Sequence, residues 1–123
     1  MKAHEIVLFL VEKQNQLRIL HWQTKGYARH MAYGGIYEAL DELIDSFVEG
    51  YQGKYGRFEL PNNASVSLLN VSNDKMNNFI EETVKALGGE MVKDLEKDDT
   101  NLLNIRDEML QQFNKLKYLL TLE

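Results

Sequence analysis

The sequence predicts an all-α fold: a four-helix bundle with one long crossover between its second and third helices. Apolar residues recur at three- and four-residue steps in four separate stretches, which is helical spacing. The chain's one proline, Pro61, falls in the long stretch that lacks this spacing. With 123 residues the chain has the length of one domain. We therefore expect residues 1–123 to form a single helical domain.

The first helix is expected over residues 3–25. His21 lies one turn beyond Leu17, at the edge of the apolar stripe. Gly26 is expected to end the helix, because glycine readily adopts the left-handed conformation found there. The stripe consists of Ile6, Leu10, Lys13, Leu17, Leu20 and Thr24.

The second helix is expected over residues 29–54. Its apolar residues alternate four- and three-residue steps, which is a heptad seam. Acidic residues lie beside that seam, and Gly53 and Gly56 mark the helix end. The seam consists of Tyr33, Tyr37, Leu40, Ile44, Phe47 and Tyr51.

Residues 56–73 are rich in Gly, Asn and Ser and are expected to form the crossover. A helix of about 25 residues is ~38 Å long. An extended segment of about 17 residues reaches ~55 Å. The crossover can therefore span the whole bundle and leave the second and third helices parallel, as in bundles with one long connection.

The third helix is expected to begin near residues 72–74 and to weaken at Gly88-Gly89. Met91, Val92 and Leu95 can add a further turn or two. The fourth helix follows Asp98-Asp99 and runs to about Leu122.

Composition excludes several kinds of site and location. The chain has no cysteine, so a metal must be held by His, Asp, Glu, Tyr or backbone oxygen. A net charge of −5 without a dense basic stripe argues against nucleic-acid binding. No apolar run approaches the ~20 residues that cross a bilayer, and the N-terminus lacks a signal-peptide pattern. A cytoplasmic protein without membrane contact is expected.

Four residues could ligate a transition metal: His21, His30, Asp45 and Glu49. Asp45 and Glu49 are one helical turn apart and therefore share a face. Taken singly, each has a simpler explanation. A histidine at a stripe edge usually completes the core boundary, and acidic residues form the solvated side of most amphipathic helices.

The combination resembles a known family. His21-Trp22-Gln23-Thr24-Lys25-Gly26 is similar to the His-Trp-x-x-x-Gly stretch of the Dps miniferritins, a ferritin-like family. There a second histidine follows an aromatic residue after the glycine, an Asp lies fifteen residues further on, and a Glu four beyond that. Tyr27, His30, Asp45 and Glu49 have these intervals. The resemblance covers about residues 10–52.

The chain departs from this family in several features. The turn after Gly26 is about three residues shorter, and Gly34 replaces an acid that often lies four residues after the second histidine. The basic DNA-binding tail is absent. Residues 53–57 and 103–108 also resemble a phage-encoded group of ferritin-like proteins, and a phage-encoded chain would lie in the cytoplasm of its host cell.

The resemblance implies an iron-binding protein with a di-metal site at a two-fold interface. His21 and His30 of one subunit would face Asp45 and Glu49 of the other, with Trp22, Tyr37 and Asp41 around the ligands or at the interface. It implies a homo-oligomer, at least a dimer, that oxidises Fe(II) with dioxygen or peroxide. Two alternatives stay open: a structural zinc or iron site without turnover, and a metal-free helical dimer that binds a partner protein.

Overall fold

The computed structural model describes residues 1–122 and contains four α helices, with no strand in that range. The prediction of an all-α bundle is confirmed. The predicted helix boundaries differ from the observed ones by no more than about three residues. The helices are α1 (Ala3–Gln23), α2 (Tyr27–Tyr55), α3 (Met76–Gly88), which follows the short 3-10 helix η1 (Asn73–Lys75), and α4 (Thr100–Leu119).

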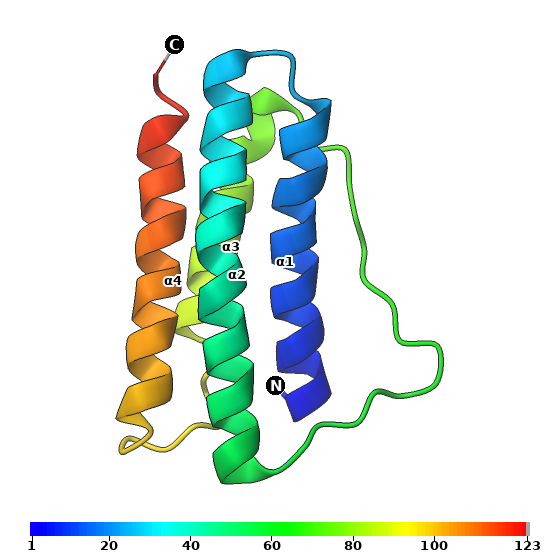
Figure 1. The fold of residues 1–123 in the computed structure, drawn as a ribbon, viewed down its shortest axis with the longest axis vertical. Helices are drawn as coiled ribbons and strands as arrows, with labels where there is room; N and C mark the ends of the chain where they lie inside the picture. Colours follow the sequence, from blue (N-terminus) through cyan, green and yellow to red (C-terminus); the bar gives the residue numbers. More distant parts are fainter. Residues whose placement is uncertain (123) are drawn as a thin grey trace.

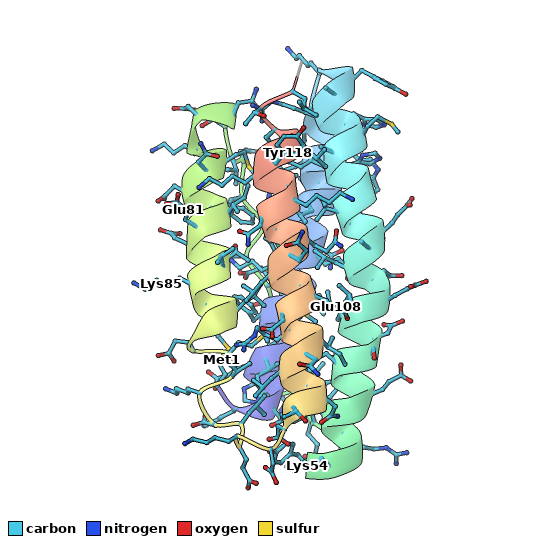
Figure 2. The ribbon with its side chains drawn as sticks, turned by 90° about the vertical axis from the view of Figure 1, so that its left-hand side faces the viewer. Met1, Lys54, Glu81, Lys85, Glu108 and Tyr118 are labelled. Carbon is cyan, nitrogen blue, oxygen red and sulfur yellow. The ribbon has the colours of Figure 1, made fainter. Side chains whose placement is uncertain are left out.

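The chain makes two antiparallel helix pairs joined by the crossover (Figure 1). Helices α1 and α2 run in opposite directions, and the segment between Tyr55 and Asn73 then returns along the whole bundle. Helix α3 consequently runs parallel to α2, as the length of the crossover predicted. Figure 2 shows α4 between α2 and α3. We call the end with the α1–α2 turn the histidine end and the opposite end the Lys54 end.

Most of the predicted stripe residues lie in the core, but Lys13, Thr24, Tyr37 and Tyr51 are only half-buried, and Ile36, which the predicted seam left out, is fully buried. All four helices contribute side chains with almost no exposed surface, and burying each large one stabilises the fold by roughly 1.5–3 kcal/mol. Between α3 and α4, Met91 and Val92 are buried in hydrogen-bonded turns instead of a continued helix. The fully buried members include Leu17, Tyr33, Ile36, Leu40, Phe47, Met76, Ile80, Leu87, Leu102, Met109, Phe113 and Leu116.

The crossover is held to α1 by polar side chains. The amide of Gln16, 2% exposed, donates to the carbonyl of Leu69 and accepts from the Leu69 N–H, both at 2.8 Å. The Glu12 carboxylate accepts from the N–H of Ser67, and Gln23 donates to Asn70. These contacts, one to two helical turns apart, hold residues 67–70 of the crossover beside α1, whereas the part nearer α2 bulges away from the bundle (Figure 1).

The Lys54 end is closed by the Asp99 carboxylate, which is 1% exposed. It accepts hydrogen bonds from Lys54 Nζ, from the Tyr55 hydroxyl and from the Glu96 N–H. The Lys54 and Tyr55 hydrogen bonds hold the pKa of Asp99 below its ordinary value of 3.8. Lys54 lies at the base of the bundle in Figure 2, where this contact joins the end of α2 to the start of α4.

Within residues 1–122, none of the helices has the length and apolar character needed to cross a membrane.

Candidate functional site

The turn between α1 and α2 brings His21 and His30 together. Helix α1 ends at Gln23 and α2 begins at Tyr27, so only three residues separate the antiparallel helices. The two imidazole rings stack with their centroids 3.8 Å apart and their planes 19° from parallel. The turn is short compared with the resembled family, and the two histidines still converge.

Each histidine is hydrogen-bonded to the backbone of the other. His21 Nδ1 lies 2.7 Å from the carbonyl oxygen of His30, and His30 Nδ1 lies 2.8 Å from that of His21. A carbonyl oxygen only accepts, so each Nδ1 carries the proton. In the neutral rings each Nε2 then has a free lone pair, and neither has a hydrogen-bond partner in the part of the chain that the structure describes. Metal-ligating histidines commonly have this arrangement.

The ring of His21 rests on Gly34. A Cβ atom at that position would lie 2.8 Å from His21 Cε1 and 2.9 Å from Nδ1, closer than real Cβ contacts. The adjacent Gly35 has no atom within 4 Å of an added Cβ. Gly34 therefore provides the space that the imidazole occupies against α2.

The surroundings of the two rings carry positive charge. Residues 18–30 contain three Lys or Arg residues and no acid. The Arg18 guanidinium lies over the Tyr37 ring, 4.5 Å from its centroid, and Arg29 donates to the Tyr33 hydroxyl at 3.4 Å. Burial raises the pKa of Tyr33, and the Arg29 contact partly opposes that rise.

Asp45 and Glu49 lie elsewhere on the chain. Both are exposed on α2, and fifteen residues separate His30 from Asp45, which corresponds to ~22 Å of helix. One subunit thus does not bring the four predicted ligands to a single ion. Within residues 1–122 no group of three or more His, Cys, Asp or Glu side chains could hold a metal ion.

The three residues predicted around the ligands have separate environments. Trp22 is 66% exposed at the end of α1. Tyr37 is half-buried beneath Arg18. Asp41 accepts a hydrogen bond from Gln14 Nε2 at 2.9 Å. Tyr37 and Asp41 thus join α1 to α2 within one chain, while Trp22 is free to contact another molecule.

Two features of this corner escaped the sequence prediction. Gly34 supports the His21 ring, and Gln14 links α1 to Asp41. A glycine pair in the middle of a helix costs up to about 1 kcal/mol per glycine, and Gly34-Gly35 is such a pair. The cost of this glycine pair was the signal in the sequence that Gly34 has a specific role. The signal for Gln14 was its position four residues after Leu10 and three before Leu17, which puts it on the apolar side of the helix.

These observations define an all-α protein with a paired-histidine corner and an acidic helix face. The family model described as "Family of unknown function (DUF5856)" matches residues 21–120, and the chain belongs to that family. It is also 34% identical, over 122 residues, to the "Uncharacterized 14.6 kDa protein in mobD-ri intergenic region" of Enterobacteria phage T4. The match covers 99% of this chain and 90% of the phage protein.

No solved structure matches the chain. The phage relative agrees with the predicted phage-encoded group.

Proposed function

We propose that this chain is a ferritin-like, metal-binding protein that forms a two-fold dimer with two sites for Fe(II). Each site would combine His21 and His30 of one subunit with Asp45 and Glu49 of the partner subunit. The observation that supports it best is the reciprocal pair of Nδ1 hydrogen bonds, which leaves both Nε2 atoms free to ligate. The crossover and the parallel α2 and α3 helices agree with a ferritin-like bundle.

The positions along α2 fit a two-fold axis. An axis perpendicular to the bundle pairs residues at equal distances on either side of it. Because His30 must meet Asp45 and Glu49, the axis would cross α2 near residues 37–40, close to its middle. That position leaves long, overlapping stretches of both α2 helices in contact.

Charge favours the same antiparallel arrangement. Residues 18–30 hold three basic residues and no acid, whereas residues 38–49 hold five acids and no Lys or Arg. In the proposed dimer each basic segment lies against the acidic segment of the partner subunit. Complementary charges of this kind select orientation and accelerate association.

Each imidazole would supply one neutral nitrogen ligand, and the two rings stack with their centroids 3.8 Å apart. Imidazole favours Fe(II) or Zn(II) over magnesium, and carboxylates favour the oxidised iron. Dioxygen or peroxide would accept the electrons that Fe(II) loses when it is oxidised to Fe(III).

Aerobic addition of Fe(II) tests the proposal. Oxygen uptake is compared between the wild type and the His21→Ala/Asp45→Ala variant, together with light scattering. We expect a dimer of about 29 kDa, twice 14.3 kDa, with uptake lost in the variant. Equal uptake by both proteins would contradict an iron-oxidising site. Metal-dependent dimerisation without uptake would instead indicate a structural zinc or iron site.

A second candidate is a metal-free helical dimer that binds a partner protein. It is favoured by the same hydrogen bonds, because His30 Nδ1 caps a carbonyl in the last turn of α1 and the stack joins two helices. In that case Fe, Zn and Mn would leave the melting temperature unchanged. A metal that binds the native state at 100 times its Kd would stabilise it by ~2.7 kcal/mol.

A further inference from the structure

We infer that Gly34 is a positioning residue: the absent side chain sets the tautomer and the direction of His21. The inference concerns how the histidine half of the proposed site is built, and its metal-binding consequence rests on the proposed function.

The contact is specific to one glycine of the pair. An added Cβ at Gly34 meets three ring atoms of His21, with Cε1 at 2.8 Å, Nδ1 at 2.9 Å and Nε2 at 3.6 Å. At Gly35 the same addition meets nothing within 4 Å. Both glycines lie in the same turn of α2, so helix propensity penalises them equally. Only Gly34 has a contact that explains its presence.

The ring cannot move away without losing its partners. On one side, His21 Nδ1 donates to the His30 carbonyl at 2.7 Å. The ring also stacks on that of His30 at a centroid distance of 3.8 Å. A Cβ at Gly34 would push the edge that carries Nδ1, so it would lengthen the hydrogen bond or separate the rings. Either movement removes the fixed Nδ1–H tautomer and redirects Nε2.

The arrangement also limits the ligands that one chain supplies. The imidazole occupies the space that a side chain at position 34 would take, so no carboxylate can reach the ring from there. Each subunit would then offer a neutral, nitrogen-only half-site. The carboxylates would have to come from the partner subunit.

The test compares Gly34→Ala with the matched control Gly35→Ala in the metal-free protein. Nitrogen-15 NMR of the histidine rings reports the tautomers. We expect the wild type and Gly35→Ala to show His21 protonated at Nδ1, and Gly34→Ala to show a mixture of tautomers. An unchanged His21 tautomer in Gly34→Ala would overturn the inference.

A double-mutant cycle with His21→Ala gives a second readout, the melting temperature, which does not depend on detecting the histidine tautomers. In the His21→Ala background the clash is gone, so Gly34→Ala should raise Tm by about 2–5 °C through helix propensity. In the wild-type background it should not raise Tm. Equal shifts in both backgrounds would contradict the positioning role, whatever the metal chemistry.

Zn(II) titration separates this inference from the proposed function. We expect Gly34→Ala to bind Zn(II) about 10–100-fold more weakly than Gly35→Ala, the usual loss when the support of a ligand is removed. Equal Zn(II) affinity of the two variants would contradict the link from ring position to metal. If the wild type bound no metal but the tautomer and the cycle behaved as expected, the proposed function would fail and the positioning role would stand.

Discussion

At the residue scale, Asp99 fixes the Lys54 end through a buried carboxylate with three donors. Lys54 and Tyr55 lie in the segment that resembles a phage-encoded group. In the structure both residues donate hydrogen bonds to Asp99. Their hydrogen bonds favour the charged carboxylate, so the pKa of Asp99 is lowered and that of Lys54 is raised.

We predict that Asp99→Asn lowers Tm by several degrees at pH 7 and that the difference shrinks in acid. A carboxyl with a lowered native pKa stabilises the fold fully above its unfolded pKa and loses this contribution as pH falls through the native one. Thermal melts of both proteins from pH 7 to pH 3 measure the difference, which should begin to narrow near pH 4. A constant difference over this range would contradict the charge-based explanation.

The sequence singled out the two histidines but not the residue that supports them. The resemblance to the miniferritin motif marked His21 and His30, and in the structure a three-residue turn brings their rings together. The need for Gly34 depends on which ring lies over which turn of α2, and no local pattern contains that distance. Asp99 was expected only to precede the fourth helix, and two of its three donors, Lys54 and Tyr55, come from 45 and 44 residues away.

At the element scale, the crossover depends on α1 for its position. It has no regular secondary structure between Tyr55 and Asn73, and Gln16 satisfies both backbone groups of Leu69. The length of the crossover was predictable from its composition. Its register on α1 was not, because Glu12 and Gln16 resemble any polar positions on a helix.

We predict that Gln16→Ala lowers the free energy of unfolding by ~1–3 kcal/mol, since the N–H and the carbonyl of Leu69 both lose the Gln16 amide as partner. Urea denaturation measures the loss, and limited proteolysis should cut residues 57–71 faster than in the wild type. Gln23→Ala is the control, because its hydrogen bond to Asn70 is exposed. Unchanged proteolysis in Gln16→Ala would show that other contacts hold the crossover.

At the scale of the whole molecule, charge is divided between the two ends of the α1–α2 face. The histidine end is basic around residues 18–30, and the five acids of residues 38–49 follow further along α2. Asp45 and Glu49 make no ion pair in the described chain and are exposed. The proposed dimer uses both segments at once.

We predict that Asp45→Lys/Glu49→Lys weakens the dimer while the single chain stays folded. Exposed substitutions usually change stability by no more than ~0.5 kcal/mol. Sedimentation velocity at low and at high salt measures the association. The control is Glu82→Lys/Glu108→Lys, which makes the same charge change on α3 and α4 (Glu108 is labelled in Figure 2). Equal association of the two variants would place the interface elsewhere.

The central claim is that each metal site is shared between two subunits, and subunit complementation tests it most directly. His21→Ala/His30→Ala and Asp45→Ala/Glu49→Ala are refolded separately and as an equal mixture, and bound Fe(II) or Zn(II) is counted. Each variant alone should bind no metal at these sites. The mixture should recover about a quarter of the wild-type sites, since half of the dimers are mixed and each has one intact site of two. No recovery in the mixture, with dimers present, would contradict a shared site.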